Sequence, residues 1–114
     1  MNRKVGFIGC GNMSKAIIGG IVNSGYMSPN DIFVSNRSLP SLEEVKRKYE
    51  VHTTQDNVEV AQNCDLIFLA VKPYQYATVI EQIKEVVHEH AIIIMIAAGQ
   101  TIEQNEQRFG RRMK

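Results

Sequence analysis

The sequence lacks most of the features that mark specialised classes of protein. It has no tryptophan, two cysteines and three prolines in 114 residues, and its formal net charge is +1. The longest uninterrupted apolar run covers residues 91–98, which is well short of the roughly 20 residues that a membrane-spanning helix needs. Cys10 and Cys64 lie too far apart for a clustered metal site and are too few for a disulfide framework. These absences exclude membrane-spanning and disulfide-rich proteins.

The remaining composition is that of one folded domain. Hydrophobic residues make up 44% and charged residues 22% of the chain, which is normal for a globular protein of this length. Residues 1–4 lead directly into an apolar run without a signal-peptide pattern. The balanced charge favours neither nucleic acid nor a membrane as a partner, and the basic residues at 108–114 are interpreted as a solvated terminus. We therefore expect a cytoplasmic protein.

Apolar runs and helix-like segments alternate along the chain. The expected strands cover 4–9, 31–35, 51–54, 65–71 and 91–96. The expected helices cover 13–24, 39–49, 57–62, 74–88 and 101–109. Strands that are apolar throughout and separated by helices indicate a parallel sheet covered on both faces. The sequence predicts an α/β protein with a doubly wound, mainly parallel sheet, as a single domain over 1–114.

A glycine-rich loop follows the first expected strand. Residues 9–14 read Gly-Cys-Gly-Asn-Met-Ser, which matches the dinucleotide-binding pattern G-x-G-x-x-G except for serine at the third glycine position. In such loops Gly9 allows a tight turn, Gly11 lets the backbone approach a pyrophosphate, and the following helix attracts its negative charge. The alternative is a structural turn in which both glycines have positive φ and no ligand binds.

The second expected strand ends without the carboxylate that would bind a ribose 2′-hydroxyl. It ends instead in Ser35, Asn36, Arg37 and Ser38, a cation with hydroxyl and amide groups that suits a 2′-phosphate. This favours NADPH over NADH, although NADH remains possible. The alternative is that Arg37 is an ordinary solvated arginine.

Two further segments should reach the same edge of the sheet. Ala70-Val71-Lys72-Pro73 ends the fourth expected strand, and Ile96-Ala97-Ala98-Gly99 ends the fifth. Small residues there would let a flat nicotinamide ring lie against the backbone. Lys72 has no neighbouring group that would tune it as an acid, so a surface or phosphate-binding role is favoured. The spacing of His88 and His90 favours a solvated turn over a metal site, and Cys10 is interpreted as a space-filling residue.

These segments together resemble the amino-terminal half of the Δ1-pyrroline-5-carboxylate reductase family. The resemblance rests on GFIGCGNMSKAIIGG (6–20), VSNRS (34–38), the Asp56-Asn57 pair, CDLIFLAVKP (64–73) and IAAG (96–99). It implies a Rossmann-type domain followed by a helical domain. It also implies reduction of 1-pyrroline-5-carboxylate to L-proline by hydride transfer from NAD(P)H, in a homo-oligomeric full-length enzyme.

The resemblance also implies cofactor-binding positions, and it places no catalytic or metal-binding residue in this chain. The pyrophosphate would be held by Ile8, Gly9, Cys10, Gly11, Asn12 and Met13. Asn36 and Arg37 would lie on the 2′-phosphate side, and Asn57 would contact the adenosine portion. The nicotinamide would be lined by Ala70, Val71, Lys72, Pro73, Ile96, Ala97 and Ala98.

The chain departs from the family in two respects. Ser14 stands where the family usually has alanine or glycine, and the chain ends at Lys114, before the helical domain that supplies the substrate pocket. We therefore expect a portion that binds dinucleotide but does not turn over alone. The alternatives are a hydroxyacid-dehydrogenase-type NADP enzyme and a non-catalytic relative that senses nucleotide.

Overall fold

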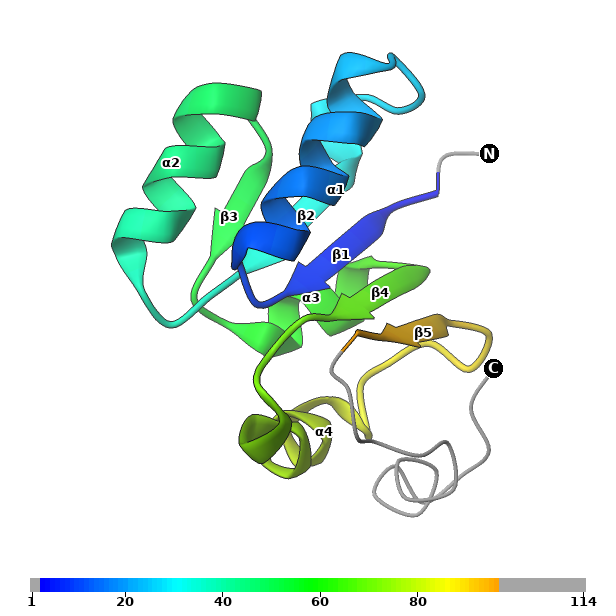
Figure 1. Cartoon of the computed structure of the whole chain (residues 1–114). Coiled ribbons are helices and arrows are strands. Elements are labelled where there is room, and N and C mark those ends of the chain that lie inside the picture. The colour runs from blue at the N-terminus through cyan, green and yellow to red at the C-terminus, as the bar shows by residue number, and fades with distance from the viewer. Residues whose placement is uncertain (1–2, 97–114) are drawn as a thin grey trace.

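The computed structural model describes residues 3–96, which form a five-stranded parallel sheet with helices on both faces (Figure 1). The strands are β1 (Val5–Ile8), β2 (Ile32–Ser35), β3 (His52–Thr54), β4 (Leu66–Leu69) and β5 (Ile92–Met95). Their order across the sheet is β3-β2-β1-β4-β5, and every neighbouring pair is parallel. The predicted α/β architecture is confirmed.

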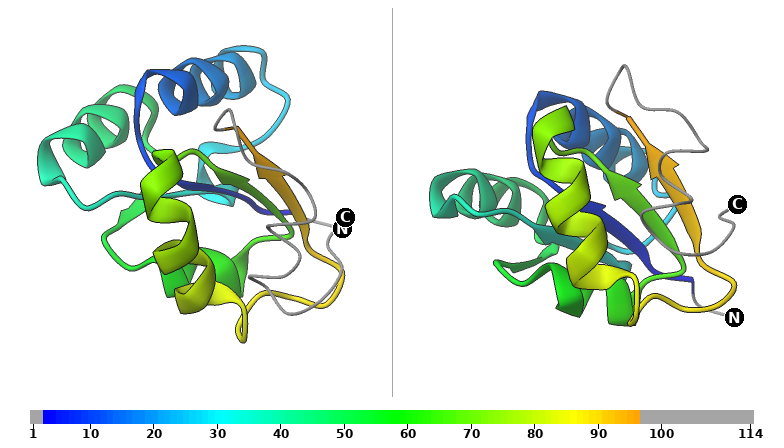
Figure 2. Two further views of the ribbon diagram at one scale, coloured as in Figure 1. Left: turned by 60° about the horizontal axis from the view of Figure 1, so that its bottom comes forward. Right: turned by 90° about the horizontal axis from the view of Figure 1, so that it is seen from below.

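The helices divide between the two faces of the sheet. They are α1 (Asn12–Asn23), α2 (Leu39–Tyr49), α3 (Asn57–Asn63) and α4 (Tyr76–Ile83), with short 3₁₀ turns η1 (Pro29–Asp31) and η2 (Pro73–Gln75). Figure 2 shows α1 and α2 on one side of the sheet and α4 on the other. α3 lies on the same side as α4 and packs against it (Figure 1).

Each face of the sheet has its own buried core. On the side of α1 and α2, Phe7 and Val34 pack with Ile18 and Val45, all with no exposed surface. On the side of α3 and α4, the buried side chains of the sheet and of both helices form a second cluster, which includes Ile67 and Ile80. Successive strand residues point to opposite faces, so apolar residues at every position bury both faces.

The last residues of the strands are in register. Ile8 pairs with Ser35 and Leu69, Ser35 pairs with Thr54, and Leu69 pairs with Met95. The segments after all five strands therefore emerge at one edge of the sheet. The chain moves from β1 to β2 on one side and returns to β4 on the other, so the loops after β1 and β4 flank the switch point where open α/β sheets bind ligands.

One predicted helix is shorter than expected. The segment predicted as a helix over 74–88 contains η2 and then α4, which ends at Ile83. The Ile83 carbonyl accepts hydrogen bonds from the amides of both Val86 and Val87, which closes the helix in a turn. Val87 is buried in the core beyond this turn, so its apolar character reflected burial and not a continuing helix. The predicted helix over 101–109 lies outside the described residues.

Among the described residues, no helix is long and apolar enough to span a membrane.

Candidate functional site

The two glycines of the loop after β1 differ in whether the fold requires glycine at their positions. Gly9 has φ +106°, and an added Cβ would collide with the Ala70 carbonyl group, 2.7 Å from its carbon. Gly11 has φ −90°, a value open to any residue, and an added Cβ would meet no atom within 4 Å. The fold itself therefore requires Gly9. At Gly11 neither conformation nor packing requires glycine, so the alternative of two turn glycines is wrong for this position.

Ser14, at the third position of the pattern, fixes the loop to the first turn of α1. Its side chain is fully buried, and its hydroxyl donates a 2.7 Å hydrogen bond to the Gly9 carbonyl. The α1 helix begins after Gly11 with no side-chain cap and no acidic residue in its first turn. Its first amides and its dipole are therefore available to an anion.

A small cavity of about 180 Å³ lies beside this loop, at the switch point. From the loop it is lined by Gly9, Cys10 and Gly11, and from the end of β2 by Asn36. On the other side it is lined by Ala70, Val71, Lys72 and Gln75. Gly9 and Gly11 have no side chain, and the Cys10 thiol bonds the Ser41 carbonyl of α2. The glycine loop therefore offers chiefly backbone, which suits a phosphate group better than an apolar ligand.

A large cavity of about 530 Å³ adjoins the small cavity, and the two share Gln75. Arg37, Gln55, Asp56, Asn57 and Val58 line one side of it. Tyr74, Thr78, Val79 and Gln82 line the other side, together with Gln75. The volume is in the range of small-molecule sites.

Asn57 and Gln82, which line the large cavity, belong to a hydrogen-bonded series that starts at the buried Ser35. The buried Ser35 hydroxyl donates to Asn57 Oδ1 at 2.6 Å, and Asn57 Nδ2 donates to Gln82 Oε1 at 2.8 Å. Asp56 caps α3 by accepting the Val58 amide at 2.9 Å. These contacts fix Asn57 from both sides.

Arg37 is exposed at the rim of the large cavity. Its backbone carbonyl accepts a hydrogen bond from Gln55 Nε2 at 2.9 Å. In the part of the chain that the structure describes, no ion pair engages its guanidinium. The arginine is therefore available to an anionic group of a ligand in this cavity.

The structure brings most of the sequence-predicted positions together at this edge. Asn12 and Met13 are exposed at the start of α1, Pro73 opens η2, and the Ile96 amide donates to the Leu69 carbonyl at 3.2 Å. Ile8 differs from the rest because its side chain is buried in the core, although its carbonyl accepts the Ala70 amide at 2.8 Å. Ala97 and Ala98 lie outside the described residues.

The sequence analysis missed the side of the large cavity that comes from α4 and the turn before it. Gln75, Thr78 and Gln82 line the cavity, and their spacing of three and four residues places them along one stripe of a helix. This polar stripe beside the apolar Val79 and Ile83 is a signal in the sequence that could have identified them.

Both cysteines are buried and uncharged. Burial raises the pKa of the Cys64 thiol to about 12, with Asp65 adding to the effect. Burial also raises the pKa of the Cys10 thiol, which Lys15 partly offsets. The Cys10 thiol donates to the Ser41 carbonyl at 3.6 Å, so it packs against α2 as a neutral side chain, in keeping with its interpretation as a space-filling residue.

Comparison with known proteins places this edge of the sheet in a functional context. The family described as "NADP oxidoreductase coenzyme F420-dependent" matches residues 4–99. The chain belongs to this family. The match covers all five strands and both cavities, so the NADP oxidoreductase domain coincides with the described fold.

Individual relatives in this family have more specific names. It is 37% identical over 110 residues to the pyrroline-5-carboxylate reductase of Escherichia coli K12, covering 96% of this chain and 41% of that protein. The solved structure of a Coxiella burnetii pyrroline-5-carboxylate reductase matches with a TM-score of 0.91 and 42% identity, over 96% of this chain and 41% of that one. The pyrroline carboxylate reductase of Plasmodium falciparum, solved with NADP bound, matches with a TM-score of 0.80 and 30% identity, over 95% of this chain and 38% of that one.

These relatives agree with the resemblance seen in the sequence. The chain spans about two fifths of the length of the relatives that it matches.

Proposed function

We propose that this chain is the NADP-binding portion of a reductase that converts 1-pyrroline-5-carboxylate to L-proline in the cytoplasm, as part of proline biosynthesis. The observation that carries the cofactor assignment is Gly11, where the backbone faces open space and the fold has no other reason for glycine. The substrate assignment is supported by the names of the relatives that match nearly the whole chain.

The two cavities fit the shape and charge of NADPH. The pyrophosphate would lie in the small cavity against the glycine loop and the uncapped start of α1, with Ile8, Asn12 and Met13 forming the ends of this segment. The adenosine would occupy the large cavity beside Asn57, with its 2′-phosphate near Arg37. Arg37 and the glycine loop border adjoining cavities, as one dinucleotide requires.

The nicotinamide would lie on the far side of the small cavity from Arg37. Ala70 and Val71 are half-buried there, Lys72 and Pro73 are exposed, and Ile96 continues the same edge. We propose that Ala97 and Ala98 also line the nicotinamide. When bound, NADPH supplies a hydride to the substrate, and the residues of this chain hold and orient the dinucleotide while excluding water from one side of it.

The substrate would be bound outside this chain. The relatives extend well beyond the matched region, so we propose that the isolated 114-residue chain binds dinucleotide without producing proline. We also propose that the full-length protein forms a homo-oligomer and uses neither nucleic acid nor membrane as a partner. Formation of proline by the purified chain from NADPH and 1-pyrroline-5-carboxylate would contradict the first of these statements.

The direct test is calorimetric titration of the purified chain with NADPH and with NADH. We expect both to bind, and NADPH to bind at least about tenfold more tightly because of its additional charged contacts. Arg37→Ala should abolish this preference. The exposed Arg47 on α2 lines neither cavity, so Arg47→Ala is the matched control and should keep the preference.

Two other outcomes would redirect the assignment. Equal binding of the two dinucleotides would keep the cofactor site and remove the 2′-phosphate role of Arg37. Absence of binding would contradict the proposal for this chain.

A chimera can test whether this chain serves as the cofactor-binding portion of a pyrroline-5-carboxylate reductase. Replacing the matched 41% of the Escherichia coli reductase with this chain should yield a protein that oxidises NADPH only when 1-pyrroline-5-carboxylate is present. The same chimera carrying Gly11→Ala is the control and should lose most of this activity. A folded chimera that binds NADPH but forms no proline from 1-pyrroline-5-carboxylate would contradict the assignment of this chain to such a reductase.

A further inference from the structure

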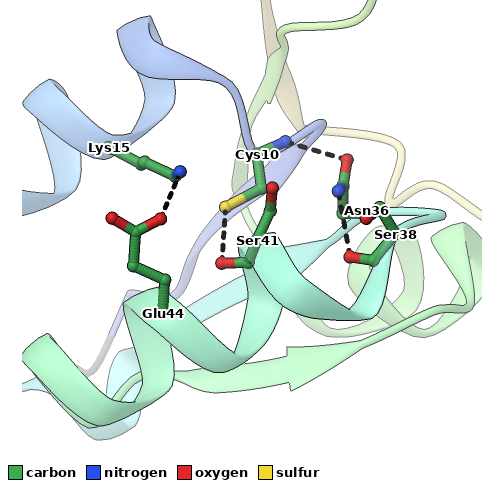
Figure 3. Close-up of polar contacts among 6 residues, drawn as sticks. All are labelled: Cys10, Lys15, Asn36, Ser38, Ser41 and Glu44. Atoms are coloured by element: carbon green, nitrogen blue, oxygen red, sulfur yellow. Dashed lines mark hydrogen bonds and ion pairs between the residues drawn. The ribbon is translucent and has the colours of Figure 1, made fainter.

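The side chain of Asn36 joins the glycine loop to the loop between β2 and α2. Its Oδ1 accepts a hydrogen bond from the Cys10 amide at 3.2 Å, and its Nδ2 donates to the Ser38 carbonyl at 3.2 Å. Figure 3 shows the Asn36 side chain between these two backbone groups. An amide N–H can only donate and a carbonyl can only accept, so the two partners fix which end of the Asn36 side chain faces which loop.

The backbone of Asn36 is itself anchored to the sheet. Its amide donates to the Thr54 carbonyl at 3.3 Å, and the preceding residue, Ser35, accepts the Gly9 amide at 2.9 Å through its carbonyl. The side chain is half-buried. The Asn36 backbone is therefore fixed at the end of β2, and its side chain is hydrogen-bonded to the backbone of both loops.

The Gly9 amide also joins the start of the glycine loop to the Ser35 carbonyl at the end of β2, but the other side-chain links shown in Figure 3 are weaker in kind than those of Asn36. The Cys10 thiol donates to the Ser41 carbonyl at 3.6 Å, and Lys15 pairs with Glu44 at 2.6 Å on the surface (Figure 3). A thiol is a weak donor, and exposed ion pairs contribute little to stability. Asn36 makes the one bridge shown in Figure 3 that bonds the backbone of both loops.

We propose that Asn36 is a positioning residue that holds the glycine loop at a fixed position relative to the segment that carries Arg37. This inference rests on the proposed function, because it concerns how the pyrophosphate and 2′-phosphate positions are held relative to each other. It assigns to Asn36 a task other than the direct 2′-phosphate contact implied by the resemblance. The hydrogen bonds to Cys10 and Ser38 turn the side chain toward the protein backbone and leave only one Nδ2 hydrogen for a ligand.

The two roles have different consequences for cofactor choice. NADH and NADPH share the pyrophosphate, so an improperly placed glycine loop weakens both to a similar extent. Only NADPH has the 2′-phosphate, so loss of a contact to that group weakens NADPH alone. The ratio of the two affinities therefore separates a positioning residue from a contact residue.

The experiment compares Asn36→Ala, Arg37→Ala and Glu44→Gln by titration with NADPH and NADH. Asn36→Ala should weaken both dinucleotides by about fivefold, the effect of about one hydrogen bond, and change their ratio by less than about twofold. Arg37→Ala should weaken NADPH alone. Glu44→Gln removes the surface ion pair between α1 and α2 and serves as the control, with binding expected to stay within about twofold of the original.

A second measurement detects the bridge without any ligand. Hydrogen exchange of the Cys10 amide, followed by NMR in the ligand-free chain, should accelerate by about fivefold or more in Asn36→Ala. Asn36→Asp keeps an oxygen acceptor for the Cys10 amide but has no donor for the Ser38 carbonyl, so it should retain the slow exchange at Cys10 while losing the bond to Ser38. This rescue by a conservative variant is not expected from a general loss of stability.

Each outcome decides between the roles. Selective loss of NADPH in Asn36→Ala, or unchanged binding of both dinucleotides, would overturn the positioning role. Unchanged exchange at Cys10 in Asn36→Ala would overturn it as well. If the original chain binds neither dinucleotide, the proposed function fails, while the exchange measurement still decides whether Asn36 holds the loop.

Discussion

The small and large cavities share Gln75 but are built in different ways. The small cavity lies where β1 and β4 end, and the glycine loop side of it, with Gly9 and Gly11, is formed largely by backbone. The large cavity is formed by side chains from the end of β2, the start of α3 and the exposed side of α4. A backbone cavity depends on a few glycines, whereas a side-chain cavity spreads its contacts over many residues.

This difference predicts where single substitutions have their largest effects. A change at a glycine alters the path or the accessibility of the backbone, and no neighbouring residue can compensate for it. A change at one side chain of the large cavity leaves the others in place. The predictions below test this contrast, beginning with the largest expected effect.

Gly9→Ala should damage the fold and the site together. Residue 9 has φ +106° and its Cβ would collide with the Ala70 carbonyl, so we expect a loss of unfolding free energy of about 3 kcal/mol. Urea unfolding followed by circular dichroism measures this loss. Gly25 is the matched control because it also has positive φ, +72°, but an added Cβ there would meet open space. Equal losses of unfolding free energy in Gly9→Ala and Gly25→Ala would show that the collision with the Ala70 carbonyl adds nothing to the loss.

Gly11→Ala should separate binding from folding. The unfolding free energy should stay within about 1 kcal/mol, because the backbone angles suit alanine and the position is open. Affinity for NADPH and NADH should both fall by about tenfold or more, since the added methyl group lies where the pyrophosphate must approach. Titration and urea unfolding of the same preparation measure the two quantities. Unchanged affinity would refute the reason offered for glycine at this position.

Gln82→Ala should have a smaller effect, typical of the large cavity. It removes the acceptor for Asn57 Nδ2, and we expect a loss of about threefold in affinity for both dinucleotides with their ratio unchanged. Gln62→Ala, at an exposed position of α3 that lines neither cavity, should change nothing. A loss of dinucleotide affinity in Gln82→Ala larger than that in Gly11→Ala would contradict the proposed difference between the two cavities.

The smallest effect concerns pH. Burial raises the pKa of Cys10 above its usual value of 9.0, so the thiol beside the small cavity keeps its proton as the pH approaches that value. A thiolate there would repel a phosphate, and its absence predicts constant NADPH affinity between about pH 7 and 9. Fluorescence titration across this range measures the affinity. A fall in affinity that disappears in Cys10→Ser would show that the thiol ionises.

The same contrast explains what the sequence could predict. The glycine loop was recognised because residue 9 needs glycine for its unusual backbone angle, and because Gly11 completes the dinucleotide-binding spacing although the fold itself does not require glycine there. Leu39–Tyr49 was predicted with its observed bounds, because Leu42 and Val45 repeat at helical spacing and Pro40 suits a helix start. Features that depend on local backbone conformation can therefore be predicted from the sequence.

Features that depend on how helices and loops pack against one another were predicted less well. Thr78 and Gln82 are exposed polar residues on an amphipathic helix. Only the placement of α4 beside α3 brings both into the large cavity and lets Gln82 bond to Asn57. Asn36 was identified as a site residue, but its bridge from Cys10 to Ser38 depends on two loops whose separation the sequence does not specify. Val86 and Val87 continued the apolar pattern of α4 although the helix ends at Ile83.

The buried hydrogen bond from Ser14 to the Gly9 carbonyl has a consequence for the time course of binding. The loop is ordered as part of folding, so its conformational entropy is lost before a ligand arrives and does not reduce the affinity. We therefore expect association of a dinucleotide to need no slow rearrangement of this loop. Serine at the third position of the glycine pattern thus replaces close packing with a hydrogen bond, and it makes the first strand, the loop and the helix a single preformed unit.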